Sequence, residues 1–150
     1  MRPAKREIKV CRAARLLLAV AVGLFALPSV GAAPAPLGPE PTRAELRQWF
    51  SLLRADGVVD VGAPLNWEYA FSAADGRKLE ALSQTLVAGG YRIVTLQSAP
   101  TGLSQLRVSK VELHTPATLE RRSAELRALA RSRGAVSYDG VNVGPAAGAR

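Results

Sequence analysis

The side chains that could do chemistry in this chain are few, and they centre on one histidine. His114 is the only histidine among the 150 residues, so a Ser-His-Asp arrangement would have to be built around it. It directly precedes Thr115 and Pro116, which have the residue types of a helix N-cap and first helical position. We therefore interpret His114 as a polar turn residue and predict that the protein is not an enzyme.

Two carboxylates and one cysteine complete the chemical inventory. Glu68 and Glu112 lie on two expected strands and could in principle share acid–base work, but we interpret both as solvated strand residues. The only cysteine, Cys11, lies near the N-terminus, and one histidine cannot form a metal site by itself. No phosphate-binding or dinucleotide motif is present, so we predict no metal and no cofactor.

The first 32 residues have the order of a secretory signal peptide. Residues 1–15 are basic, residues 16–27 are apolar, and small residues follow Pro28. We expect cleavage between Ala32 and Ala33, which predicts a periplasmic or secreted protein without a stable membrane anchor. The apolar run is about 18 Å long as a helix, against a hydrocarbon core of about 30 Å. The alternative is an uncleaved N-terminal membrane anchor.

The formal net charge of +8 comes mostly from this leader. Residues 1–32 hold six basic side chains and one acidic one, and the rest of the chain holds 14 basic and 11 acidic ones. The remaining excess is small, so we interpret it as solvated helix faces. The alternative is a site for a polyanion such as nucleic acid.

The pattern of apolar residues predicts one folded domain over residues 42–145. Prolines recur every two or three positions within residues 33–41, which predicts an extended, solvated spacer. Residues 146–150 are expected to be a disordered tail. Thr42 and Glu45 have the spacing of a capping box. The helix that they start has an apolar face every three or four residues, formed by Leu46, Trp49, Phe50 and Leu53.

Four strands and two further helices follow this opening helix. Strands are expected over residues 65–72, 91–97, 103–114 and 136–143, where β-branched and aromatic residues alternate with polar ones. The helices lie between them, and their expected inner faces comprise Leu79, Leu82, Leu86 and Val87 in the first and Leu119, Leu126, Leu129 and Ala130 in the second. The order β-α-β-β-α-β predicts an α+β, ferredoxin-like sandwich with a four-stranded antiparallel sheet and an extra N-terminal helix.

Several stretches of this pattern resemble the regulator of ribonuclease activity B (RraB) family. They are "WEYAF", "LVAGGYRI", "LRVSKV", "LERRSAELRALARSRG" and the closing "YDGVNVGP", which is similar to the family's Tyr-Asp-Gly ending. The resemblance implies a ferredoxin-like protein that inhibits a ribonuclease such as ribonuclease E by binding it. Ribonuclease E is cytoplasmic, so the predicted export leaves the partner of this chain open.

The candidate partner-binding residues are Tyr138, Asp139 and Gly140 at a bend or bulge, with Tyr69 and Arg107 on the sheet. We expect a protein partner. The alternative is an RNA-binding module, cytoplasmic or membrane-tethered, in which Tyr69 and Tyr138 stack bases beside Arg107 on the uncovered sheet face. We expect the opening helix to bury its apolar side on that face instead, which would make both tyrosines part of the core.

Overall fold

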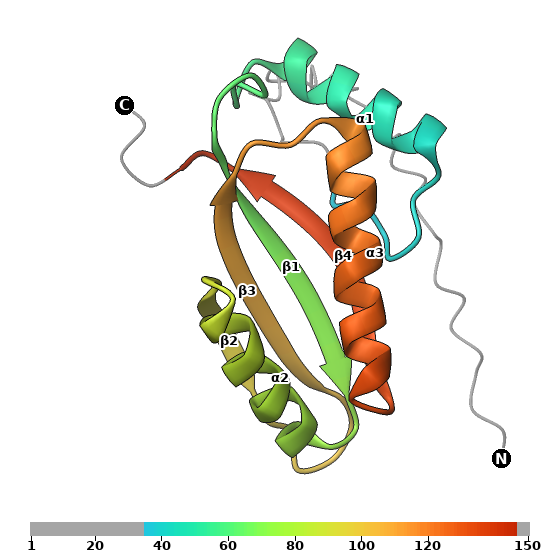
Figure 1. Cartoon of the computed structure of the whole chain (residues 1–150), viewed down its shortest axis with the longest axis vertical. Coiled ribbons are helices and arrows are strands. Elements are labelled where there is room, and N and C mark those ends of the chain that lie inside the picture. Colours follow the sequence, from blue (N-terminus) through green and yellow to red (C-terminus); the bar gives the residue numbers. More distant parts are fainter. Residues whose placement is uncertain (1–34, 147–150) are drawn as a thin grey trace, which may run out of the picture.

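The computed structural model describes residues 35–146 and shows a four-stranded antiparallel sheet with helices packed against it (Figure 1). The elements follow in the order α1 (Arg43–Asp56), β1 (Leu65–Ala73), α2 (Gly76–Ala88), β2 (Arg92–Gln97), β3 (Ser104–Glu112), α3 (Pro116–Ser132) and β4 (Val136–Gly144). The predicted signal peptide with its cleavage site lies outside the described residues, as does most of the predicted tail.

The strands lie in the order β2-β3-β1-β4, so the first and third strands form the middle of the sheet. β2 and β3 pair as a hairpin, and β4 pairs with β1 from Asn66 opposite Gly144 to Ala73 opposite Val136. The prediction that the closing stretch is a strand beside the first one is confirmed. It is held by a full antiparallel ladder and is part of the fold.

The two faces of the sheet differ because side chains alternate along each strand. In β1, Trp67, Tyr69 and Phe71 are buried, whereas the residues between them are only half-buried. Figure 1 shows α2 and α3 on the same face of the sheet, and their leucines join these aromatic rings in the core. The other face carries the half-buried and exposed polar side chains.

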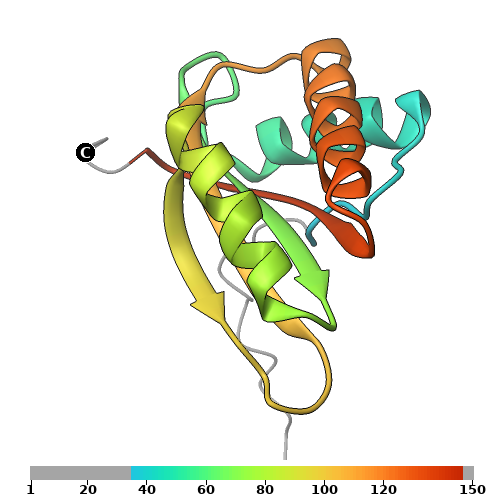
Figure 2. The same ribbon diagram turned by 60° about the horizontal axis from the view of Figure 1, so that its bottom comes forward.

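Helix α1 has the predicted start and apolar face, but a different packing surface. Thr42 and Glu45 form the capping box, and Gly57 ends the helix in the left-handed conformation. We expected α1 to cover the open face of the sheet, and this was wrong. Its rings meet Trp67 on the helix-covered face, with ring centres 6.1 Å apart for Trp49 and 5.9 Å for Phe50. Figure 2 shows α1 crossing α3 at one end of the sheet, where the two helices are in contact.

The inner faces of α2 and α3 agree with the sequence pattern except at Val87. This side chain is 49% exposed, whereas Leu86 beside it is buried, so Val87 lies at the margin of the buried stripe of α2. Leu129 of α3 is partly buried against the core. In α3, Thr115 is the N-cap and Pro116 opens the first turn as predicted.

Within residues 35–146, no helix combines the length and apolar character needed to cross a membrane.

Candidate functional site

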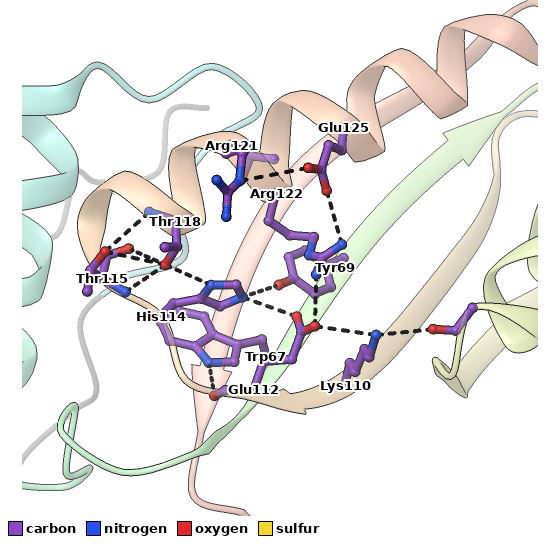
Figure 3. A network of polar contacts seen from close by, with 12 residues as sticks. Trp67, Tyr69, Lys110, Glu112, His114, Thr115, Thr118, Arg121, Arg122 and Glu125 are labelled. Atoms are coloured by element: carbon purple, nitrogen blue, oxygen red, sulfur yellow. Dashed lines mark hydrogen bonds and ion pairs between the residues drawn. The ribbon is translucent and has the colours of Figure 1, made fainter.

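A buried polar cluster forms where β3 ends and α3 begins (Figure 3). Glu112 is the last residue of β3, and His114 follows it in the connection to α3. The Nε2 atom of His114 lies 3.1 Å from a carboxylate oxygen of Glu112 and 3.3 Å from the hydroxyl of Tyr69. The Nδ1 atom lies 3.2 Å from the hydroxyl of Thr118, in the first turn of α3. Both ring nitrogens therefore have partners within the domain.

Burial favours the neutral forms of His114 and Tyr69. The pKa of His114 lies below its ordinary value because burial disfavours the imidazolium, although the Glu112 carboxylate opposes the shift. The neutral ring has one N–H group, and a carboxylate can only accept a hydrogen bond. We therefore place the proton on Nε2, toward Glu112, with Nδ1 accepting from Thr118. Burial also raises the pKa of Tyr69, which keeps its hydroxyl protonated.

The charge of Glu112 is balanced by two cations. Arg122 contacts its carboxylate at 2.9 Å and Lys110 at 3.3 Å, and Arg122 also pairs with Glu125 at 3.0 Å. The cluster itself borders a pocket of about 210 Å³, which is lined by Glu112, Leu113, His114, Thr118, Arg121, Arg122 and Glu125. The acid–base groups are thus engaged with one another, and this arrangement connects the end of β3 to the start of α3. Among residues 35–146, no three His, Cys, Asp or Glu side chains lie close enough to hold a metal ion.

The structure separates the tyrosines from the arginine of the proposed RNA-stacking surface. Tyr69 is 0% exposed and Tyr138 is 4% exposed, and both lie under the helices. The hydroxyl of Tyr138 donates to Ser123 of α3 at 3.2 Å. Arg107 lies on the opposite face, where it pairs with Glu68. The expectation that the two tyrosines belong to the core is confirmed, but α2 and α3 bury them, and α1 does not cover the open face.

The open face of the sheet is mostly polar, with Val111 as an exposed apolar side chain on it. All the aromatic side chains of the described part of the chain are buried in the core, so none of them is presented on this face. The face carries Asn66, Glu68, Ser72, Arg92, Thr95, Gln105, Arg107 and Asp139. It offers hydrogen bonds and mixed charge, and lacks the exposed rings on which bases stack.

The predicted bulge in β4 is present at Asp139 and Gly140. The register of β4 against β1 shifts between Ala70 and Phe71, which leaves an extra residue in β4. The exposed Asp139 side chain accepts a hydrogen bond from the Ser72 hydroxyl at 3.1 Å. Gly140 has a φ of 132°, a value that other residues rarely adopt. The bulge therefore needs glycine for its backbone conformation.

Residues 35–40, which we call the strap, lie along the outer edge of β4 at this bulge. The N–H of Leu37 donates to the carbonyl of Val141 at 2.9 Å, and the N–H of Val141 donates back at 3.0 Å. A Cβ atom on Gly140 would overlap the carbonyl oxygen of Leu37. The strap thus comes so close to the bulge that only glycine fits there.

The two ends of the strap are bound by helices. The indole N–H of Trp49 in α1 donates to the carbonyl of Ala35 at 3.0 Å. Arg127 in α3 donates to the carbonyl of Pro39 at 2.8 Å, and Arg131 pairs with Glu40 at 3.2 Å. We expected a solvated spacer here, and the described part of that segment contacts the domain instead.

No pattern in the sequence had predicted the interactions of four residues, Leu37, Glu40, Arg127 and Arg131. A signal was present, because Leu37 is the only large apolar residue and Glu40 the only charged residue between residues 33 and 41. The prolines around them dominated the interpretation.

Comparison with known proteins identifies one family. The family model described as regulator of ribonuclease activity B, RraB, matches residues 43–143. This range begins at the first residue of α1 and ends one residue before the end of β4. The comparison with curated proteins found no match.

Proposed function

The chain belongs to the RraB family, and we propose that it is a non-enzymatic regulator that inhibits a ribonuclease, such as ribonuclease E, by binding it. The observation that carries this proposal is the extent of the match, which includes all the helices and strands of the described domain. The description of the family names regulation of a ribonuclease. We also assign the domain to the ferredoxin-like fold, on the order β2-β3-β1-β4 and the two crossover helices.

The polar cluster supports inhibition by contact over inhibition by chemistry. His114 and Glu112 are hydrogen-bonded to each other and to residues of the same domain, and His114 is 7% exposed. An acid–base catalyst has to reach a substrate proton, and here the ring nitrogens face Glu112, Tyr69 and Thr118. A regulator that acts by occlusion needs only a surface that matches its partner.

We propose in addition that the protein acts outside the cytoplasm. The support is the order of basic, apolar and small residues over 1–32, which is typical of a cleaved leader. The ribonuclease that it meets would then be an exported one. Fractionation followed by N-terminal sequencing tests this: a start at Ala33 in an exported fraction supports export, and an intact Met1 in the cytosol returns ribonuclease E as the direct target.

The test of inhibition is a cleavage assay with a fluorescent RNA and purified ribonuclease E. We expect the cleavage rate to fall as the full chain is added and to level off once the enzyme is saturated. The assay is repeated with RNA in large excess over the chain. Inhibition that persists supports binding to the enzyme, whereas inhibition that disappears shows that the chain sequesters RNA.

The control variant in this assay is His114→Gln. It removes the imidazole and keeps a polar side chain of related size, so we expect inhibition to be unchanged. A loss of inhibition by His114→Gln with the fold intact would assign the polar cluster to the function.

A further inference from the structure

The outer edge of β4 pairs with no other strand of the sheet, and the strap covers part of it. A strand at the end of a sheet presents unpaired N–H and C=O groups, which are a template for another extended segment. Here the strap forms hydrogen bonds with part of that edge, through one antiparallel bridge between Leu37 and Val141. Within the part of the chain that the structure describes, this bridge is the only pairing between the strap and β4.

Proline limits how well the strap can pair. Pro39 lies two residues after Leu37, where the N–H of an extended segment would again point toward β4, and proline has no N–H group to donate. The groups of Val143 point to the same side of β4 as those of Val141, because hydrogen-bonding direction alternates along a strand. A segment that stays extended opposite Val143 and has another residue in place of Pro39 could therefore form more backbone hydrogen bonds with β4 than the strap does.

The contacts of the strap define the chemistry of a competing segment. Leu37 packs against the hydrophobic core, so the edge accepts an apolar side chain at the pairing position. Three residues later, Glu40 pairs with Arg131 at 3.2 Å and with Arg127 at 3.5 Å. Both arginines project from α3 beside the edge and would be left without their carboxylate if the strap moved away.

The edge is built for close approach by a backbone. The bulge places Gly140 opposite Leu37, and the absence of a side chain at Gly140 lets the two main chains come into contact. A pocket of about 300 Å³ continues along this edge between Glu40, Arg131 and Tyr138. These features extend the site beyond the single bridge that the strap forms.

We propose that the outer edge of β4, with Arg127 and Arg131, is a peptide-binding site that the strap guards. Its partner is an extended segment that lacks proline where it pairs with β4 and that carries an apolar residue and, three residues later, a carboxylate. Such a segment binds by adding a strand to β4 and displaces the strap. This inference rests on the proposed function in one respect, because it assigns the segment to the regulated ribonuclease.

The test uses a synthetic peptide that copies residues 33–42 with Pro36→Thr and Pro39→Thr. It is titrated into three full-length proteins: the natural chain, Leu37→Pro and Gly38→Ala. Leu37→Pro removes the N–H that binds Val141, whereas Gly38→Ala is the matched control because open space surrounds Gly38. Binding is followed by NMR at the amide resonances of Val141 and Val143.

We expect the peptide to bind Leu37→Pro about tenfold more tightly than the natural chain or Gly38→Ala, because a guarded edge is available only part of the time. A peptide that also carries Glu40→Lys should bind more weakly to all three proteins. Equal binding to the natural chain and Leu37→Pro, or shifts confined to other strands, would overturn the inference. If Leu37→Pro does not fold, Glu40→Lys in the full chain releases the arginine end of the strap and takes its place.

This peptide titration contains no ribonuclease, so its outcome is independent of the cleavage assay. If the peptide does not bind the edge of β4, the proposed peptide-binding site is wrong, and the proposal that the chain inhibits a ribonuclease is unaffected. If the peptide binds but the chain does not inhibit the ribonuclease, the peptide-binding site is supported and the ribonuclease is not its partner. If the peptide and the ribonuclease compete for the chain, the edge of β4 is the site that binds the ribonuclease.

Discussion

The indole ring of Trp67 meets the imidazole ring of His114 edge to face, with ring centres 5.1 Å apart and an angle of 77° between the ring planes. The same indole stacks with the ring of Phe50 in α1 and donates its N–H to the carbonyl of Glu112 at 2.9 Å. Trp67 therefore connects the packing of α1 to the polar cluster at the junction of β3 and α3.

The first prediction concerns the stability that Trp67 provides. Trp67→Ala should lower the free energy of unfolding by about 3–5 kcal/mol, because the side chain is 1% exposed and its removal leaves a cavity. Denaturant unfolding measures this change. Val111→Ala is the control on a neighbouring strand, since Val111 is 53% exposed. A loss for Trp67→Ala as small as that of the control would show that this side chain is not packed in the core.

The second prediction concerns acid. Burial holds the pKa of folded His114 below the ordinary value of 6.5, so the unfolded chain binds the proton more readily. The stability gained from the neutral ring is complete above about pH 6.5 and is lost as the pH falls toward the folded pKa. We expect the free energy of unfolding to decrease between pH 7 and pH 5.

The control for this pH dependence is His114→Gln, measured over the same interval. Glu112, Arg121 and Arg122 remain in place, and only the imidazole is removed. The decrease in stability should become smaller in the variant. The same pH profile for both proteins would assign the effect to carboxylates elsewhere in the domain.

Most of the fold follows from local patterns in the sequence. Alternation over residues 65–72 placed Trp67, Tyr69 and Phe71 on one face, and the capping residues Thr42 and Thr115 fixed two helix starts. Such patterns specify which face of an element is apolar. They do not specify which neighbouring element covers that face, and this is why the prediction for the packing of α1 was wrong.

The strap was not predictable from local patterns for a related reason. Its binding depends on Val141 and Arg127, which are about a hundred residues away along the chain, and its own composition favours an extended spacer. Only the bend or bulge predicted at Gly140 gave a hint, because glycine permits a positive φ and a close approach of two main chains. The structure shows both features at Gly140.

The third prediction concerns the three tyrosines of the chain. Burial raises the pKa of Tyr91 and of Tyr138 to about 12, and it raises the pKa of Tyr69 as well. Their contribution to stability is complete below about pH 10 and is lost as the pH rises through the folded values. Ultraviolet titration of the folded protein should show little phenolate near pH 10, whereas the urea-unfolded chain should titrate there. A tyrosine that titrates near pH 10 in the folded protein would contradict its burial.

The fourth prediction concerns RNA. The open face has Arg92 and Arg107 but none of the aromatic side chains that the structure describes, so we expect it to contribute no measurable RNA affinity. Filter binding at two salt concentrations compares the natural chain with Arg92→Ala/Arg107→Ala. The two proteins should retain the same amount of RNA. Retention that falls in the double variant and weakens steeply with salt would restore the RNA-binding alternative.

The fifth prediction separates the two reasons for glycine at position 140. Gly140→Ala should destabilise the protein by about 1–3 kcal/mol through its φ of 132° alone, and the overlap with Leu37 adds to this cost. Gly144→Ala is the control in the same strand, because nothing lies within 4 Å of a Cβ atom there. It should change the free energy of unfolding much less.

A double-mutant cycle with Leu37→Pro isolates the contribution of the strap. Once Leu37→Pro has released the strap, the added methyl group of Gly140→Ala meets no backbone, and only the conformational strain remains. The double variant should therefore be more stable than the sum of the two single changes predicts, by about 0.5–3 kcal/mol as for residues in direct contact. Denaturant unfolding of the four proteins measures this coupling. Additive changes would mean that Leu37 and Gly140 do not touch in solution, and that glycine is required at the bulge by its backbone conformation alone.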